Sequence, residues 1–369
     1  MNSFLVPRGG PYLLTHSVGC LPQAARAALD SGFLAPWAER GGNAWPLWLQ
    51  QIDMFRVALA NLLGGAAGEY CPQANLSSGL VKLLSALPRA DPAKRVLLAA
   101  EDSFPSLGFV LRQAQRYGFE LRLIPRTQTP DELRTWSAAL GSDVRLALVT
   151  HVHSNTGRVA PVADIAGLCR SRDILCVVDV AQSAGILPLD LPSIGADVVL
   201  GSCIKWLCGG PGAGWLWIRG DLVAALEPSD VGWFSHADPF EMDIHSFRYG
   251  ADARRFWGGT PSVAPFVVAA AGIGHIASLG VEAILAHNRR LVQTLKDGLP
   301  AAWRSRLPAW PIGGTLCIPL GGDFDAVTAA LQAADAQFDC RGDVLRLSFH
   351  ACNTPVDAAQ VARAWRGEL

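Results

Sequence analysis

Short apolar runs alternate with stretches of helical periodicity over residues 95–201, and this alternation limits the folds open to the chain. Runs such as RVLLAA and VRLALVT are apolar at nearly every position, which is typical of strands buried on both faces of a parallel sheet. Intervening helices would cover those two faces. We expect strands over 95–100, 121–124, 144–150, 174–180 and 197–201, and helices over 106–117 and 162–171.

The pattern changes towards the C-terminus. The run GWLWI (214–218) follows a Gly/Pro turn too short to hold a crossover helix, so it is expected to enter the sheet antiparallel. We also expect a long helical stretch over 263–297, strands over 314–319 and 344–349, and a last helix from Pro355.

These patterns predict an α/β fold in three parts. A large domain with a mainly parallel sheet is expected over 51–255, and a smaller α+β domain over 256–369. The N-terminal segment, 1–50, is expected to pack on the smaller domain.

Composition restricts the classes of function. The net charge is −1, and no basic stripe suggests nucleic-acid binding. Apolar runs are interrupted before about 20 residues, the length of a membrane span, so no transmembrane helix is expected. The N-terminus lacks the pattern of a secretion signal. Nine cysteines, none in a C-x-x-C pair, indicate reduced thiols in a cytoplasmic protein.

Lys205 is the most unusual of the four lysines, because it lies between apolar residues and before a glycine-rich turn. An ammonium group placed there has to be paired, have a lowered pKa or be covalently engaged. Asp179 closes the apolar run ILCVVDV, 26 residues upstream. A lysine in an apolar site, with a carboxylate to hold a pyridinium nitrogen, is what an enzyme dependent on pyridoxal 5′-phosphate requires.

Three hydroxyl side chains are candidates to bind the phosphate of such a cofactor. Ser77 and Ser78 stand at the start of a predicted helix, where free N–H groups and the helix dipole attract anions. An ordinary helix cap is the alternative interpretation of this pair. Ser202 lies three residues before Lys205.

Other residues are candidates to contact the cofactor ring and the substrate. Phe104 follows a strand and could stack on the ring, and Gln182 or Ser154 could donate a hydrogen bond to its 3′-oxygen. Arg346 interrupts an apolar strand, and a guanidinium suits the carboxylate of an amino acid substrate.

Two other kinds of site are less well supported by the pattern. His151 and His153 fall on one side of a strand, but no third ligand of suitable spacing accompanies them, so no metal site is expected. The glycine-rich run 209–214 leads into a strand rather than a helix, unlike a nucleotide-binding loop.

Several motifs resemble fold-type I pyridoxal-phosphate enzymes of the class V aminotransferase superfamily, and most of all the kynureninases. The run SCIKWLCGGPGAG at 202–214 resembles the kynureninase lysine loop, and DVAQSAG at 179–185 resembles D-L-A-H-[SA]-x-G. FPS at 104–106, VGWFSH at 231–236 and VLRLS at 344–348 resemble further segments of that family, so the likeness spans nearly the whole chain.

The resemblance implies a role for each matching residue. Lys205 would carry the cofactor, Asp179 would pair with its ring nitrogen, Phe104 would cover the ring and Arg346 would bind the substrate carboxylate. The family is dimeric, so the resemblance implies a homodimer in which Trp233 and Thr260 reach the phosphate of the neighbouring subunit.

The chain also departs from the kynureninase pattern. Ile204 stands where a tyrosine is expected, Gln182 replaces a histidine, and residues 41–48 lack the family's substrate-site histidine and arginine. The reaction therefore stays open between amino-group transfer and hydrolytic Cβ–Cγ cleavage. A cysteine desulfurase-like lyase, with Cys340 or Cys352 as the thiol, and a non-catalytic binding subunit are the alternatives.

Overall fold

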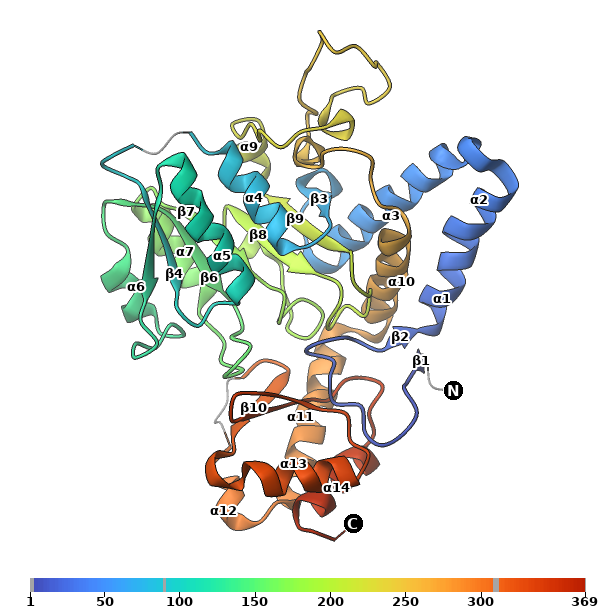
Figure 1. The fold of residues 1–369 in the computed structure, drawn as a ribbon, viewed down its shortest axis with the longest axis vertical. Coiled ribbons are helices and arrows are strands. Elements are labelled where there is room, and N and C mark those ends of the chain that lie inside the picture. The colour runs from blue at the N-terminus through green and yellow to red at the C-terminus, as the bar shows by residue number, and fades with distance from the viewer. Residues whose placement is uncertain (1–2, 89–90, 308–311, 369) are drawn as a thin grey trace.

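The computed structural model describes residues 3–88, 91–307 and 312–368. Its centre is a seven-stranded sheet in the order β3-β9-β8-β7-β6-β4-β5 (Figure 1). The strands are β3 (Tyr70–Gln73), β4 (Val96–Ala100), β5 (Glu120–Ile124), β6 (Val144–Thr150), β7 (Leu175–Asp179), β8 (Val198–Ser202) and β9 (Gly214–Ile218).

Five of these strands, from β8 through β5, run parallel, and β9 runs antiparallel to β8. The predicted parallel sheet and the predicted direction of β9 are thus confirmed. Edge strand β3 was not predicted, because it is only four residues long and contains Pro72. Proline cannot donate a ladder hydrogen bond and is therefore confined to sheet edges.

Helices cover both faces of the sheet, as the continuous apolar strands require. On one face lie α4 (Leu76–Ala86) and α5 (Pro105–Gln113), with the short α9 (Gly220–Val223). On the other face lie α3 (Trp45–Leu63), α6 (Leu133–Ala139), α7 (Val162–Ser171), α8 (Leu191–Ile194) and α10 (Ala264–Leu279). Neighbouring strand residues alternate between the two cores: Val177 packs in one and Val178 in the other.

The smaller domain has a three-stranded antiparallel sheet in the order β10-β12-β11. Its strands are β10 (Thr315–Pro319), β11 (Asp339–Arg341) and β12 (Val344–Ser348). Its helices are α11 (Val281–Gly298), α12 (Ala301–Arg304), α13 (Phe324–Ala333) and α14 (Pro355–Trp365). Leu345 and Leu347 point into its core, so the alternate residues Arg346 and Ser348 lie on the opposite face of the sheet.

The long helical stretch expected over 263–297 is two helices, and this corrects the prediction. It breaks at Gly280, whose φ of +79° ends α10 and precedes α11, and the two axes meet at 75°. The bend allows α10 to pack on the large domain and α11 on the small one. In the part of the chain that the structure describes, no single helix has the length and apolar character to cross a membrane, although this bent pair would pass together.

The N-terminal segment contacts the large domain as well as the small domain, on which it was expected to pack. Leu13 lies in the small-domain core, and Leu14 bridges Ser348 beside β12. After the short pair β1 (Phe4–Leu5) and β2 (Leu21–Pro22), however, α1 (Gln23–Leu29) contacts α10. A π-helical turn leads on to α2 (Ala35–Arg40), and α3 then enters the large-domain core through apolar side chains such as Phe55.

Candidate active site

A cavity of about 550 Å³ opens where the carboxyl ends of three central strands meet. The final residues of β6 and β7, Thr150 and Asp179, are paired neighbours in the sheet, and β8 ends beside them at Ser202. Ligands of open α/β sheets bind at such strand ends. The predicted site residues that line this cavity are Ser77, Phe104, Ser154, Asp179, Gln182, Ser202, Lys205 and Arg346.

Lys205 and Asp179 are held in the same low-dielectric environment. Burial lowers the pKa of Lys205 to about 8, although the Asp179 carboxylate acts in the opposite direction. Burial also raises the pKa of Asp179. The Ala181 N–H, which donates to Asp179 Oδ1 at 2.8 Å, acts in the opposite direction and lowers that pKa. The Lys205 ammonium lies 5.6 Å from the centre of the Phe104 ring. A reactive amine, a carboxylate and an aromatic face thus share one cavity.

The first turn of α4 forms one wall of the cavity. Asn75 caps the helix: its Oδ1 accepts hydrogen bonds from the Ser78 N–H at 3.0 Å and the Ser78 hydroxyl at 3.2 Å. Ser77 faces the cavity, whereas Ser78 is a capping partner that does not line it. Gly214 lets this turn approach β9, because a Cβ there would lie 2.8 Å from the Asn75 Cα. The N–H groups of a first helical turn lack partners within the helix and can bind an anion.

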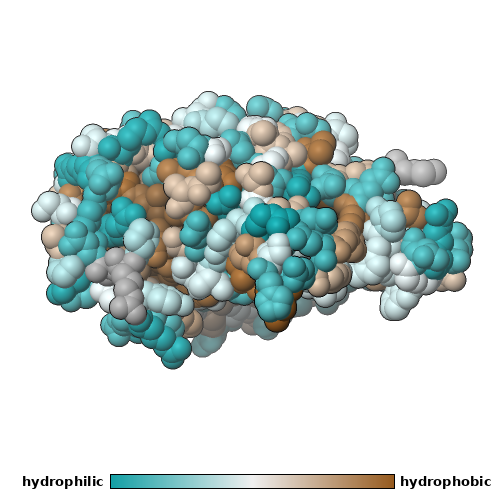
Figure 2. Space-filling view, turned by 90° about the horizontal axis from the view of Figure 1, so that it is seen from above, coloured by the Kyte–Doolittle hydropathy of each residue, from teal (hydrophilic) through white to brown (hydrophobic). Residues whose placement is uncertain are grey.

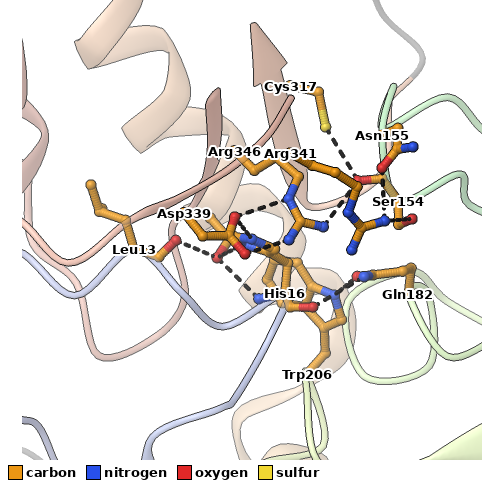
Figure 3. Close-up of polar contacts among 11 residues, drawn as sticks. Leu13, His16, Ser154, Asn155, Gln182, Trp206, Cys317, Asp339, Arg341 and Arg346 are labelled. Atoms are coloured by element: carbon orange, nitrogen blue, oxygen red, sulfur yellow. Dashed lines mark hydrogen bonds and ion pairs between the residues drawn. The ribbon is translucent and has the colours of Figure 1, made fainter. Parts of the chain in front are cut away.

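Arg346 reaches the cavity from β12 and is already oriented by the protein. Its Nε donates to Asp339 Oδ1 at 2.9 Å, its Nη2 pairs with Asp339 Oδ2, and its Nη1 donates to the Ser154 carbonyl at 3.3 Å (Figure 3). Burial alone would raise the pKa of Asp339, but hydrogen bonds from His16 and Arg346 lower it to about 2.

Arg341 and His16 are among the cavity residues that were not predicted as site residues from the sequence. Arg341 Nη1 donates to Ser154 Oγ at 2.9 Å and to Asn155 Oδ1 at 2.8 Å. Its signal was present: in DCR (339–341), Asp339 and Arg341 alternate as they do on one face of a strand. His16 had no such signal, because the fold brings it from the N-terminal segment to within 2.9 Å of both Asp339 and Ser348.

Gln182 lines the cavity with its amide engaged at both ends. Its Nε2 donates to the His16 carbonyl at 3.0 Å, and its Oε1 accepts from the Trp206 indole at 3.3 Å. These bonds tie the N-terminal segment to the loop that carries Lys205 (Figure 3). The hydrogen bond predicted from Gln182 to the ring's 3′-oxygen stays a prediction.

Trp233 and Thr260 lie outside this cavity. Trp233 belongs to an aromatic cluster with Trp45, Phe234 and Phe240, at ring separations of 4.5 to 6.0 Å. Thr260 is exposed. Both roles were predicted across a subunit interface, and they stay predictions.

The two histidines of the pair are buried. His151 Nδ1 is 2.9 Å from the Ser183 hydroxyl, and burial lowers the pKa of His151 to about 4. His153 Nδ1 is 3.2 Å from Asp102 Oδ2. Across the residues that the structure describes, no cluster of three metal-ligating side chains is found.

The candidate thiols for a desulfurase lie elsewhere. Among the described residues that line the cavity there is no cysteine. Cys352 is buried 3.7 Å from Cys20, and Cys340 opens towards a separate surface hollow beside Phe324. The thiol of Cys317 lies 3.8 Å from the Ser154 carbonyl, and burial raises its pKa to about 12.

The sequence of the chain is similar to a known family and to characterised proteins. The model of the aminotransferase class-V family matches residues 86–311. A kynureninase of Burkholderia pseudomallei (strain 1106a) is 30% identical over 322 residues, which are 84% of this chain and 74% of the relative. A kynureninase of Pseudomonas fluorescens is 30% identical over 252 residues, 66% of this chain and 59% of the relative.

Solved structures share the fold at lower identity. The cystine C–S lyase C-DES, in complex with its product cysteine persulfide, superposes with a TM-score of 0.84 at 23% identity, covering 96% of this chain and 97% of that one. An apo cysteine desulfurase from Thermococcus onnurineus NA1 gives a TM-score of 0.83 at 20% identity, covering 96% and 93%. These likenesses establish the fold alone.

Proposed function

We propose that this chain, which belongs to the aminotransferase class-V family of pyridoxal-phosphate-dependent enzymes, transfers the amino group of an amino acid substrate. The observation that carries the proposal is the presence of Lys205 and Asp179 in one cavity at the strand ends. If the chain were a non-catalytic subunit, the buried Lys205 amine, with its lowered pKa and the nearby Asp179 carboxylate, would have no function.

The residues of the cavity fit pyridoxal phosphate. Lys205 offers an amine for covalent attachment, and Asp179 offers a carboxylate whose Oδ1 alone is bonded among the described residues. Phe104 offers a ring face, and Ser77 with Ser202 and the first turn of α4 offers hydrogen-bond donors for a phosphate. Bound there, pyridoxal phosphate supplies an electron sink that weakens the bonds to the substrate's Cα.

The residues of the chain would then divide the work. With a pKa of about 8, Lys205 can accept and return a proton at the substrate's Cα near neutral pH. Asp179 would keep a proton on the ring nitrogen by accepting its hydrogen bond. Arg346, fixed by Asp339, would hold the substrate carboxylate.

Amino-group transfer is favoured because the cavity offers one available proton carrier. The imidazole of His16 also lines the cavity, but both of its nitrogens are engaged, by Ser348 and Asp339, and burial lowers its pKa. Hydrolysis of a Cβ–Cγ bond needs a further group that adds water to the substrate's side-chain carbonyl. In transfer, Lys205 can serve as the proton carrier both for the proton movement at Cα and for the addition of the water that releases the 2-oxo acid. Kynureninase-type hydrolysis is the second candidate, since the relatives at 30% identity are kynureninases.

Product analysis separates the two reactions. The cofactor-loaded protein is mixed with an amino acid and no acceptor. Transfer predicts release of about one 2-oxo acid per subunit and then arrest. Release of alanine from kynurenine over many turnovers would instead establish the hydrolase. No reaction with any amino acid would favour the binding subunit.

A second measurement tests the assignment of Lys205. Borohydride reduction followed by peptide mass mapping should place the cofactor adduct on Lys205, and Lys205→Ala should have no adduct while keeping its circular dichroism. An adduct on Lys82, Lys94 or Lys296 would overturn the assignment.

We further infer a cytoplasmic homodimer. All nine cysteines are free thiols, as the reducing cytoplasm favours. The dimer is supported by the family resemblance and by the exposed apolar side chains at 231–247.

A further inference from the structure

Two guanidinium groups lie on the same face of the small sheet, turned towards the cavity. Asp339 pairs with Arg346 across β11 and β12, and Arg341 follows two residues after Asp339. Residues directly opposite each other, and residues two apart, share a face of a sheet. The period-two pattern therefore delivers Asp339, Arg341 and Arg346 together, while Leu345 and Leu347 enter the core.

The charge of Arg346 is already balanced, and Arg346 keeps donors to spare. Asp339 binds it through Nε and Nη2, and one N–H of Nη1 goes to the Ser154 carbonyl. A guanidinium has five N–H donors, so two are left for a ligand. This is the arrangement of a fixed arginine that can still bind one substrate carboxylate.

Arg341 has no anionic partner among the described residues. Its Nη1 donates to two neutral oxygens, Ser154 Oγ and Asn155 Oδ1. Its Nε and Nη2 make no hydrogen bond to the part of the chain that the structure describes, and those are the two parallel donors that match a carboxylate. Burial and the nearby Arg346 lower the pKa of Arg341 more than the nearby Asp339 raises it, so a further anion beside Arg341 would stabilise its charge.

Arg341 also belongs to the same cavity as Lys205. The Phe104 ring contacts both cations, at 5.6 Å from Lys205 Nζ and 5.8 Å from Arg341 Cζ. Ser154 contacts both arginines, through its carbonyl to Arg346 and its hydroxyl to Arg341. Figure 3 shows the two guanidinium groups side by side above His16 and Gln182. An amino acid bound at Arg346 would therefore extend its side chain past a second cation, one that has no ion-pair partner among the described residues.

We propose that Arg341 forms a second anion subsite that selects amino acids with a short side chain ending in a carboxylate. The inference rests on the proposed function, because it takes the amino acid to be bound at Lys205 and Arg346. Asn155 and Ser154 hold the Arg341 fork in place, and its free edge binds the side-chain carboxylate with two hydrogen bonds. Neutral side chains of the same length leave that edge unpaired.

Calorimetric titration of the cofactor-loaded protein with acids that lack an amino group tests this subsite without a reaction. Succinate and glutarate carry two carboxylates, and butyrate and valerate carry one. A charge-assisted bidentate pair predicts about 10- to 100-fold tighter binding of the dicarboxylates. Arg341→Gln should reduce that ratio to about 1 while the Kd of the monocarboxylates stays within about twofold.

Two further variants complete the test. Arg341→Lys keeps the charge but loses the fork, so an intermediate ratio is expected. Arg363→Gln removes an exposed arginine of α14 in the same domain and should leave the ratio unchanged. Equal binding of both acid classes by the wild type, or equal weakening of both by Arg341→Gln, would overturn the subsite.

Failure of the proposed function would look different. Because these acids do not react, their relative affinities report on Arg341 whether or not amino transfer occurs. If the protein prefers dicarboxylates but releases no 2-oxo acid from aspartate or glutamate, the subsite at Arg341 is supported and amino-group transfer is ruled out.

Discussion

At the scale of single residues, burial sets the chemistry of the cavity. Lys205 is the only lysine whose amine the fold withdraws into a cavity at the strand ends, among the residues that the structure describes. Desolvation disfavours its charged form more strongly than Asp179 restores it, so the pKa of Lys205 falls from 10.5 to about 8. Near neutral pH a useful fraction of this amine is therefore uncharged and nucleophilic.

The rate at which the cofactor-free protein takes up pyridoxal phosphate should report this pKa. Only the neutral amine attacks the aldehyde, so the rate should rise with pH around a midpoint of about 8. The Asp179 anion raises the pKa of Lys205, so Asp179→Asn should move the midpoint to lower pH. The measurement is stopped-flow absorbance over a pH series.

A matched substitution controls for general effects of charge removal. Asp143→Asn breaks an exposed pair with Arg122 outside the cavity and should leave the midpoint unchanged. A midpoint above pH 10 in the wild type, or no shift with Asp179→Asn, would contradict the burial argument.

At the scale of elements, the two domains are joined by a helix break. Gly280 ends α10 and begins α11, and its φ of +79° lies in the left-handed region. A Cβ at that position would meet only Ala283 Cβ, at 3.9 Å, so space does not require glycine. The backbone conformation does, because L-residues pay for the left-handed region with steric strain.

Gly280→Ala should therefore lower the free energy of unfolding by about 1–2 kcal/mol. Gly274→Ala makes the same chemical change in the middle of α10, where nothing lies within 4 Å of the added methyl group. There alanine should stabilise by up to about 1 kcal/mol, because it favours the helix. Urea unfolding midpoints of both variants measure the contrast, and shifts of the same sign would contradict it.

At the scale of the whole molecule, the cavity is assembled from three regions. The N-terminal segment contributes His16, the large domain Lys205 and Asp179, and the small domain Arg341 and Arg346. A substrate that contacts all three would hold the two domains together. Apolar surface also appears at the end of the molecule seen in Figure 2, among hydrophilic residues.

The exposed apolar segment at 231–247 is where we expect a second copy to bind. It projects from the large domain in Figure 1, and Phe240, Met242 and Ile244 expose 54%, 70% and 92% of their surface. Sedimentation velocity should give twice the chain mass of 39.3 kDa.

Ile244→Asp should weaken that dimer by roughly tenfold or more, since burying an isoleucine contributes about 1.5–3 kcal/mol. Val356→Asp, an equally polar change at a side chain 69% exposed on α14, should leave the dimer unchanged. A monomeric wild-type protein would rule out the interface.

The sequence by itself determined the sheet and the chemistry at its centre. Continuous apolar runs predicted the parallel strands, since only burial on both faces explains them, and the short turn before GWLWI predicted its direction. Lys205 and Asp179 stood out because a charged side chain beside such an apolar run has to be paired, have a shifted pKa or be engaged by a ligand. These signals are local, so a pattern of a few residues carries them.

Only the tertiary structure decided which distant residues share the cavity. His16 and Arg346 are separated by 330 positions, yet Asp339 binds both. No local sequence pattern predicts this shared contact, because it depends on how the N-terminal segment crosses between the two domains. The tertiary structure likewise decided, through the rotation of α4 about its axis, that Ser77 lines the cavity and Ser78 does not. Only the structure shows that Asp339 pairs with Arg346, which leaves Arg341 without an ion-pair partner among the described residues.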